Sequence, residues 1–471
     1  MSIIIPANSA VGGGYAVDNS IRMSGSTVNL QKNFSGDGNR KTWTYSTWFK
    51  LSKITQSGFF NWGKGNPEFS LRFESASSNT ANNYFRVSQF DGSQPIDLVT
   101  DQFFADPSAW GHMVVAFDTT QGTASNRIKI YFNGTQITSF STETYPSVNF
   151  DTFVNQSSKI NYLAYADYEP INGYLSETVF IDGQQLAPTS FGEFDEDSGI
   201  WKPIDVSGLT FGTNGFYLDY GNSGALGADV SGNTNNFTVN NLTAIDQSTD
   251  TCTNNFCTLN PLTKRSGGTL TEGNLQYTAS TADSSIFGTM AIPPGMKVYF
   301  EVKLVSNTAQ NSIGIHSLYD GGDGAFVKGG SETGTYSFKP RGSGSVTQYF
   351  NNGSSTNTSI DNPANDTILG VAIDNANGQI HYHIAGTYIN SSDPTDNDPV
   401  ALVTGFGGAT EQYLHFSLDT TTTQPSNQFN FGSPPYSESG GNSDGNGYGN
   451  FNQAVPSGYY ALNTKNLAEY G

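Results

Sequence analysis

The sequence predicts an all-β protein made of two jelly-roll-type antiparallel β-sandwiches joined by a β-rich connector. Hydrophobic residues make up 35% of the 471-residue chain and aromatic residues 13%, which is enough to fill two cores. Charged residues are only 13%, while 53 glycines and many Asn, Ser and Thr residues supply the turns that short strands need. Between these turns apolar and polar residues alternate with a period of two, and no segment keeps a helical period over three turns.

Three segments indicate strands of the first sandwich. Residues 44–49 and 128–132 alternate as half-buried strands do, and Asn133-Gly134 is typical of a tight hairpin turn. Residues 110–117 are apolar on both faces, as an inner strand of a sandwich would be. Strands at this spacing, with turn signals between them, predict an antiparallel sandwich.

A second series of alternating segments predicts a second sandwich further along the chain. It comprises residues 298–304, 312–315, 367–374, 379–384, 413–418 and 428–431. The resulting domain boundaries are an N-terminal arm at 1–14, a first sandwich at 15–190, a connector at 191–270, a second sandwich at 271–436 and a C-terminal tail at 437–471. The connector is too aromatic for a free linker, so we expect it to pack on the first sandwich. The Gly/Asn/Ser-rich start of the tail, residues 437–449, is expected to be mobile.

Charge and hydropathy exclude two classes of partner. The chain has 21 Lys and Arg against 41 Asp and Glu, a formal charge of −20, and no basic stripe. Nucleic acid and anionic membranes are therefore poor partners, whereas neutral glycans and protein surfaces suit the chain. No stretch approaches a membrane span, and the N-terminus lacks the pattern of a signal peptide. Cys252 and Cys257 have no neighbouring ligands for a metal site, and free thiols are preferred over a local disulfide.

The first series of segments resembles the laminin-G-like branch of the concanavalin A-like lectin/glucanase fold. The resemblance is carried by residues 46–50 (STWFK), 110–118 (WGHMVVAFD), 130–134 (IYFNG) and 173–183 (GYLSETVFIDG), in this order and spacing. The second series resembles a SPRY domain, through residues 299–303 (YFEVK), 313–315 (IGI), 369–374 (LGVAID) and 429–432 (FNFG). Both resemblances imply a two-sheet sandwich.

Phrases in the connector and tail are similar to virion proteins of marine and cyanobacterial tailed phages, in which the two modules stand in this same order. They are residues 250–256 (DTCTNNF), 258–261 (TLNP) and 456–467 (PSGYYALNTKNL), with Cys252 where proline is expected. The resemblance implies a virion protein made in the host bacterial cytoplasm, in contact with other virion proteins and forming a homo-oligomer, with a trimer favoured. Capsid and tail locations both remain open.

The leading functional hypothesis is a non-catalytic protein of a tail fibre or capsid surface whose loops contact host glycan or protein receptors. A purely structural cement or decoration protein is the first alternative. A glycan depolymerase is the second, through Glu193, Asp195 and Asp197, which are similar to the Glu-x-Asp-x-Glu strand of glucanases of this fold. A solvated acidic loop is the preferred interpretation of that run, and no enzyme activity is predicted.

Calcium is the one cofactor for which the sequence offers ligands. Asp118, Asn133 and Asp182 end predicted strands, where a rim site could form, although Asx residues at strand ends more often form turns. Otherwise no cofactor is predicted.

Aromatic side chains in or beside loops could stack on the apolar face of a sugar. The candidates are Trp43, Trp62, Tyr84 and Tyr319. His381, His383 and His415 are expected to be exposed on strand faces rather than to bind a metal.

Overall fold

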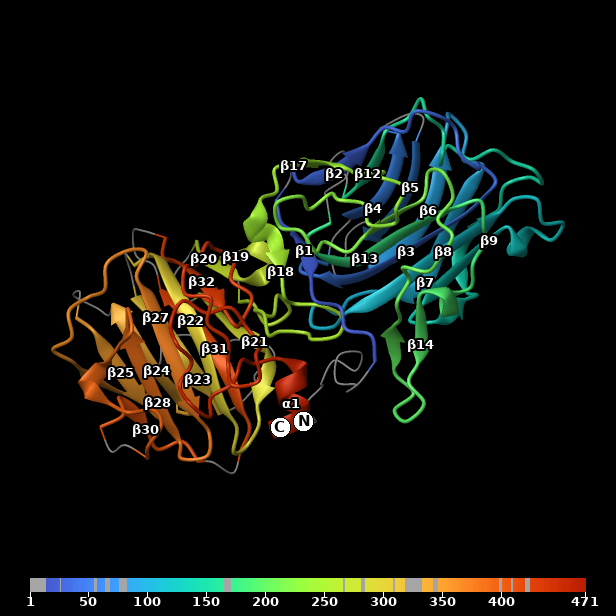
Figure 1. Ribbon diagram of the computed structural model, residues 1–471. Coiled ribbons are helices and arrows are strands. Elements are labelled where there is room, and N and C mark those ends of the chain that lie inside the picture. Colours follow the sequence, from blue (N-terminus) through green and yellow to red (C-terminus); the bar gives the residue numbers. More distant parts are fainter. Residues whose placement is uncertain are drawn as a thin grey trace. The chain divides into compact units, whose positions relative to one another are not determined.

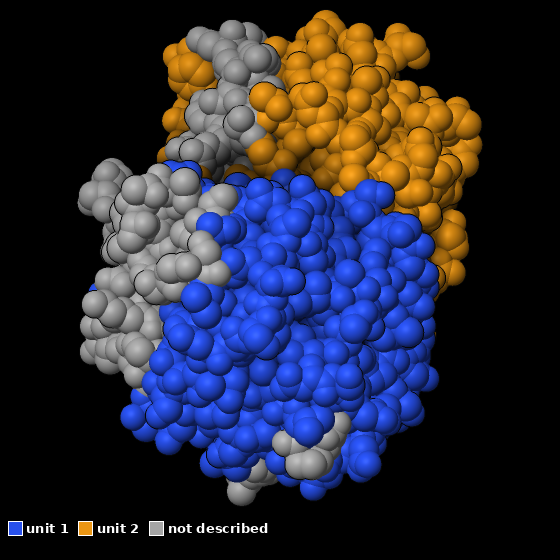
Figure 2. Space-filling view, turned by 90° about the vertical axis from the view of Figure 1, so that its left-hand side faces the viewer, with its two compact units in different colours: residues 1–6, 255–471 blue, residues 7–254 orange. Residues whose placement is uncertain are grey.

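The structure is a computed structural model that describes residues 14–25, 27–54, 57–63, 68–75, 83–164, 171–265, 267–280, 284–307, 310–317, 333–341, 346–397, 400–407, 410–419 and 424–471. Antiparallel strands dominate these residues, which confirms the predicted all-β class (Figure 1). Of the described residues, 14–254 form one compact unit, which comes first in the chain and is orange in Figure 2 (keyed there as unit 2), and 255–471 form the other, which is blue (keyed as unit 1). They are called the first and the second unit below, in chain order. The segment between the two strand series is divided accordingly, with residues 191–254 in the first unit.

Two antiparallel sheets form the sandwich of the first unit. In spatial order one sheet contains β10 (Thr135–Ile137), β9 (Ile128–Phe132), β8 (Gly111–Asp118), β3 (Thr42–Leu51), β13 (Gly173–Asp182), β1 (Ser20–Met23) and β18 (Gln247–Ser248), with β16 (Phe216–Leu218) paired to β13. The other contains β11 (Phe140–Thr144), β7 (Ile96–Phe103), β6 (Asn83–Phe90), β5 (Glu68–Ser75), β4 (Ser57–Gly63), β12 (Asn161–Leu163), β2 (Asn29–Lys32) and β17 (Thr238–Asn240). A separate hairpin joins β14 (Gly192–Phe194) to β15 (Trp201–Pro203).

Aromatic side chains fill the space between these sheets. Trp43 of β3 stacks on Phe117 of β8 at 4.0 Å between ring centroids and meets Phe69 of β5 edge-on at 5.4 Å. Phe60 of β4 and Phe180 of β13 meet across the sandwich at 5.8 Å. Such ring pairs stabilise beyond the area that they bury. The second apolar face of β8 is buried as well, because Val114 belongs to a separate apolar cluster with Val179 and Ile181 of β13.

The second unit is also a two-sheet sandwich. One sheet contains β19 (Gly268–Thr271), β20 (Gln276–Ala279), β32 (Ser426–Asn430), β22 (Lys297–Ser306), β27 (Ile368–Asp374), β28 (Gln379–Ile384) and β29 (Thr387–Tyr388), with β30 (Val403–Thr404) paired to β28. The other contains β21 (Ser284–Ile292), β31 (Gln412–Asp419), β23 (Gln310–His316), β24 (Thr335–Arg341), β25 (Gln348–Asn351) and β26 (Ser354–Asn357). Short 3-10 turns lie at Ala124–Asn126, Pro188–Ser190, Ala244–Asp246, Glu272–Asn274 and Ile389–Ser391.

The C-terminal tail is folded. The expectation that residues 437–449 are mobile is wrong, because buried Asp444 accepts hydrogen bonds through Oδ2 from the N–H of Ala461 at 2.9 Å and from the side chain of Asn466 at 2.8 Å. The carboxylate of Glu301, on the outer face of β22, accepts hydrogen bonds from the backbone N–H groups of Asn452 at 2.9 Å and Gln453 at 2.8 Å. Phe451 is fully buried against Tyr299 at 5.2 Å. The tail ends in α1 (Thr464–Tyr470), whose first turn is capped by the side chain of Asn463. Among the described residues, no helix has the length and apolar character to cross a membrane.

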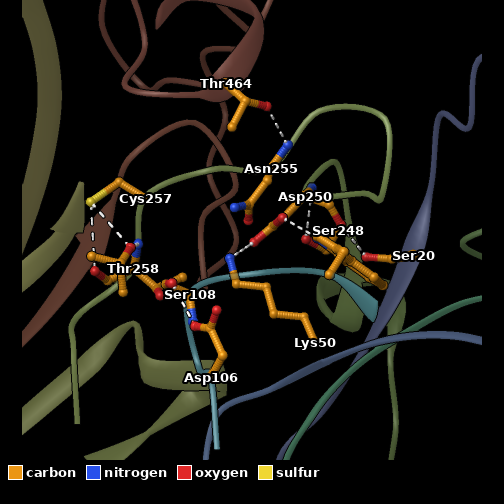
Figure 3. A network of polar contacts seen from close by, with 12 residues as sticks. Ser20, Lys50, Asp106, Ser108, Ser248, Asp250, Asn255, Cys257, Thr258 and Thr464 are labelled. Atoms are coloured by element: carbon orange, nitrogen blue, oxygen red, sulfur yellow. Dashed lines mark hydrogen bonds and ion pairs between the residues drawn. The ribbon is translucent and has the colours of Figure 1, made fainter. Parts of the chain in front are cut away.

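A buried ion pair fixes the last segment of the first unit to β3. Lys50 Nζ lies 2.8 Å from Asp250 Oδ2, and both side chains are almost inaccessible to water (Figure 3). The indole N–H of Trp110 donates to Asp250 Oδ1 at 2.9 Å, and Ser20 Oγ donates to the backbone carbonyl of Asp250 at 2.6 Å. Because each oxygen of Asp250 has a donor, the buried charge is compensated.

Both cysteines are buried free thiols, as preferred from the sequence. All five histidines are buried, so the expected exposure of His381, His383 and His415 is wrong. His383 Nε2 lies 2.8 Å from the hydroxyl of Tyr299. Burial lowers the pKa of His112 and His415 to about 3 and that of His383 to about 4. These rings are therefore neutral in the folded chain at pH 7.

We expect Lys50→Met to destabilise the first unit by about 3–5 kcal/mol, because the charge of Asp250 would remain buried without its cation. Urea unfolding of the full chain measures the loss. The matched control is Lys41→Met, because Lys41 forms an exposed pair with Asp151 at 4.0 Å. That variant should lose less than about 1 kcal/mol. Equal losses in the two variants would contradict a structural role for the buried pair.

Acid should destabilise the chain through its histidines. The pKa of these histidines is lower in the folded chain than in the unfolded chain, where it is about 6.5. Above about pH 6.5 the ring is neutral in both states, so its contribution to stability is fully present. As the pH falls below about 6.5 the unfolded chain binds a proton that the folded chain does not, and the folded state is destabilised. His415→Phe tests this, since neither ring nitrogen of His415 has a hydrogen-bond partner and Phe287 packs on the ring at 4.9 Å. Between pH 7.5 and pH 5 the variant should lose about 2 kcal/mol less unfolding free energy than the wild type. An unchanged loss on acidification would refute the assignment.

Candidate functional site

The outer face of β5, β6 and β7 carries polar and aromatic side chains in alternate positions. Phe69, Leu71 and Phe73 of β5 belong to the core, so the residues between them point away from it. Phe85 and Val87 of β6 also belong to the core, so Tyr84, Arg86 and Ser88 point away from it. We define the β5–β7 face by the outward residues Ser70, Arg72, Glu74, Tyr84, Arg86, Ser88, Asp97 and Phe103, whose strands pair directly.

Arg86 lies at the centre of this face and is held by two carboxylates. Its Nε and Nη2 contact Asp97 Oδ1 and Oδ2 at 2.6 and 3.0 Å, and its Nη1 contacts Glu74 Oε2 at 2.7 Å. Burial of the guanidinium alone would lower the pKa of Arg86, but the hydrogen bonds with Asp97 and Glu74 outweigh burial and raise it. The bidentate contact fixes the plane of the guanidinium.

Arg72 stands directly opposite Arg86 in the register of β5 and β6. Two like charges in this position would repel each other. Glu74 compensates for both, since its Oε2 also lies 3.5 Å from Arg72 Nη2. Arg72 Nη1 also donates to Ser88 Oγ at 2.8 Å and to Ser70 Oγ. The result is a charge-balanced polar cluster in which Ser70, Arg72 and Ser88 are themselves buried.

An aromatic pair borders the polar groups. Tyr84 and Phe103 are cross-strand partners whose ring centroids lie 4.8 Å apart at an interplanar angle of 50°. Phe103 is 50% exposed, and Tyr84 is half-buried. Together they offer an apolar surface beside fixed hydrogen-bonding groups, an arrangement that suits a sugar ring.

Tyr84 is the one predicted aromatic candidate that the structure places on this surface. Trp43 and Trp62 are fully buried, so neither ring can meet a ligand, and their selection as binding residues was wrong. Tyr319 lies outside the described residues. Phe103, Arg72 and Arg86 were not selected from the sequence, although the alternation of residues 68–75 and 83–90 already marks Arg72 and Arg86 as outward-facing.

The three calcium candidates do not form a site. Asp118 and Asp182 flank the start of β3, where they pair with Thr42 and Trp43. Asn133 lies at the opposite end of the same sheet, because β9 runs antiparallel to β8, and its side chain accepts the N–H of His112 at 2.8 Å. Across the described ranges, no group of three or more His, Cys, Asp or Glu residues could hold a metal ion.

The carboxylates of Asp118 and Asp182 already accept hydrogen bonds from loop residues. Asp118 accepts hydrogen bonds from Thr120 at 2.6 Å and from Gln121 at 2.6 Å. Asp182 Oδ1 accepts the N–H of Asn39 at 2.7 Å, and its Oδ2 accepts that of Asn214 at 3.0 Å. Asp118 therefore serves as a turn former, the alternative that the sequence favoured, whereas Asp182 connects two distant loops to the end of β13.

The acidic run lies on the β14–β15 hairpin, where a lysine pairs with it. Lys202 Nζ is 3.1 Å from Asp195 and 3.3 Å from Glu193, while Asp197 is exposed in the turn. Hydrogen bonds from Ser198 and from Lys202 lower the pKa of Asp195 to about 2. A glycosidase needs one carboxyl group that stays protonated near neutral pH as the general acid, and Asp195 does not supply it.

Comparisons with known proteins place the first unit in a fold superfamily. No curated protein matches the sequence. Similar solved structures include a SAP-like pentraxin from Limulus polyphemus, with 14% identity over 36% of this chain and 78% of that chain, at a TM-score of 0.28. The SPRY domain of human HERC1 has 9% identity over 36% and 96%, at a TM-score of 0.26.

A putative carbohydrate-binding protein from Bacteroides ovatus is a further similar structure, with 14% identity over 48% of this chain and 61% of that chain, at a TM-score of 0.31. The family model of the concanavalin A-like lectin/glucanases superfamily matches residues 23–183, which include the whole β5–β7 face. The first unit therefore contains a concanavalin A-like, laminin-G-type domain.

Proposed function

We propose that this chain is a non-catalytic glycan-binding protein and that the β5–β7 face is its sugar-contacting surface. The observation that carries the proposal is the exposed pair Tyr84–Phe103 beside the fixed guanidinium of Arg86. Stacking on the pair would bind the apolar face of a sugar, and the polar groups would orient its hydroxyls. The match of this domain to a superfamily that includes lectins fits such a role.

The charges of this face favour a neutral sugar. Arg72 and Arg86 balance Glu74 and Asp97, and both guanidinium groups already contact carboxylates. No cation on the described part of this face is left to bind the carboxylate of an acidic sugar, and the formal charge of −20 on the chain would repel one. Neutral hexoses are accordingly the expected ligand class.

We place this activity on the virion surface of a tailed phage, in a homo-oligomer for which a trimer is favoured. This setting is supported by the resemblance of residues 250–256 and 456–467 to phrases of phage virion proteins. Mass spectrometry of purified particles tests the location, and sedimentation of the purified chain tests the stoichiometry. A chain retained on particles that binds no host surface would instead be a decoration protein.

A glycan array of neutral and acidic oligosaccharides, followed by calorimetric titration of the best neutral sugar, tests the proposed site. Phe103→Ala and Tyr84→Ala should each weaken the Kd by about 3- to 10-fold, because each removes one ring of the stacking surface. Phe194→Ala is the matched control, since Phe194 on the β14–β15 hairpin is 51% exposed. This control should bind as the wild type does.

Two results would overturn the proposal. One is a wild-type chain that binds no sugar of the array and whose binding to host cells survives periodate treatment. The other is wild-type affinity in the Phe103→Ala and Tyr84→Ala variants.

A further inference from the structure

A buried glutamate interrupts β13 of the first unit. Glu177 has a φ of +48°, which side chains other than glycine adopt rarely, and the register of β13 against β3 shifts between Ser176 and Val179 at this point. The side chain of Glu177 is buried rather than turned to solvent. Strained residues of this kind persist only where their surroundings hold them in place, and they often mark a working part of a protein.

Tyrosine hydroxyls are the partners of this carboxylate. Tyr217 OH donates to Glu177 Oε2 at 2.7 Å, and Tyr15 OH lies 3.3 Å from the same oxygen and 3.1 Å from Tyr217 OH. Within the described part of the chain, no lysine, arginine or histidine forms an ion pair with Glu177. An ionised carboxylate here would be a buried charge without a cation.

The other charged or titratable groups near Glu177 disfavour its ionisation or leave it unaffected. Asp219 follows β16 and Asp205 follows β15, and both act on the carboxyl as like charges. Tyr220 and Cys252 are buried and neutral, and the charge of Glu177 would raise the pKa of each. Lys202 faces Gly14 but is already paired with Asp195 and Glu193. Burial raises the pKa of Glu177 to about 7. The hydrogen bonds from Tyr217 and Tyr15 act in the opposite direction but are outweighed, and the two carboxylates add a smaller upward effect.

Tyr15 belongs to a short segment that crosses the outside of the sheet, residues 14–19, here termed the N-terminal strap. Besides the contact of Tyr15, three hydrogen bonds hold the strap. Thr253 Oγ1 accepts the N–H of Val17 and donates to its carbonyl, at 3.0 Å each. Ser176 Oγ donates to the carbonyl of Asn19. Gly14, Ala16 and Asp18 are exposed. Val17 is also buried in an apolar cluster that includes Trp48, Trp110 and Trp201, and Tyr15 packs against this cluster. The strap is thus held by one apolar anchor and a few hydrogen bonds, one of which is to a carboxyl group.

We propose that Glu177 is a proton-operated latch, which keeps the N-terminal strap closed over the sheet when its carboxyl is protonated and favours opening of the strap when it is ionised. In the closed state the neutral carboxyl and the two tyrosines form a compact network without net charge. Lifting Tyr15 admits water to the carboxylate, and hydration then compensates for the charge. The strain at Glu177 keeps its side chain turned inward, so the charge cannot simply swing to the surface.

Proton binding to Glu177 and opening of the strap are linked, and this linkage sets the direction in which pH shifts the equilibrium. The closed state holds the proton of Glu177 with a pKa of about 7, whereas a solvated glutamate has a pKa near 4.5. The closed state therefore binds the proton more tightly, and raising the pH through this interval shifts the equilibrium toward the open state. Between pH 5 and pH 8 the open population should rise by roughly 30- to 100-fold.

Hydrogen–deuterium exchange of the full chain measures this opening at the strap. The buried N–H of Val17 is the reporter, because it is hydrogen-bonded in the closed state only. After correction for the intrinsic pH dependence of exchange, its protection should be roughly 30- to 100-fold lower at pH 8 than at pH 5 in the wild type. The amides of β3 report on global unfolding and serve as the internal reference.

Glu177→Gln keeps the shape and the neutral hydrogen-bonding capacity of the side chain but removes its titration. In this variant the protection of the strap should be the same at both pH values. The matched control is Glu143→Gln, because Glu143 pairs with Tyr145 at 2.9 Å on the surface of the same unit. That variant should keep the full pH dependence. Wild-type protection that is equal at pH 5 and pH 8, or pH dependence that survives in Glu177→Gln, would overturn the latch.

Discussion

Buried carboxylates hold the outlying segments of both units to their sheets. Asp250 joins the end of the first unit to β3 through Lys50, and Glu301 joins the tail to β22 through two backbone N–H groups. A carboxylate accepts several hydrogen bonds at once, so one side chain can replace much of the water that a loop would otherwise need. The covering segments in turn bury the outer faces of sheets that would be exposed in an isolated sandwich. The packing of each core and the hydrogen bonds of these buried carboxylates therefore depend on each other.

The same logic explains why the β5–β7 face is suited to binding. Its guanidinium groups are fixed by carboxylates before any ligand arrives, so little side-chain entropy would be lost on contact. Phe103 is left exposed at the end of β7 although the chain has abundant buried aromatic residues. This contrast with the closed outer face of β22 is what separates the candidate site from the rest of the molecule.

Much of the fold could be predicted from the sequence because its strands alternate strongly. The predicted segments 44–49 and 128–132 lie within or coincide with β3 and β9. The burial of Trp62 and the folding of the tail could not be read in this way, since both depend on partners far along the chain. Trp62 donates to the carbonyl of Gln156, and Glu301 holds Asn452 from 151 residues away. Composition alone marked the tail as mobile, whereas specific hydrogen bonds order it.

The candidate site was predictable only in part, for a related reason. Alternation shows that Arg72 and Arg86 face away from the core, but not that they stand opposite each other, which requires the register of β5 and β6. The calcium hypothesis failed at the same step. Asp118 and Asn133 both end strands, yet strand direction places them at opposite ends of one sheet.

The burial of all five histidines also determines how the surface behaves electrostatically. Imidazole is the side chain that ordinarily changes charge between pH 5 and pH 8, and none is accessible to solvent here. The charged side chains on the described exterior are carboxylates, lysines and arginines, whose ordinary pKa values lie outside that interval, and the carboxyl of Glu177 under the N-terminal strap is the exception. The negative potential that a partner meets is therefore nearly the same in a mildly acidic and a mildly alkaline medium, so repulsion of anionic surfaces does not depend on where in that range the protein encounters them.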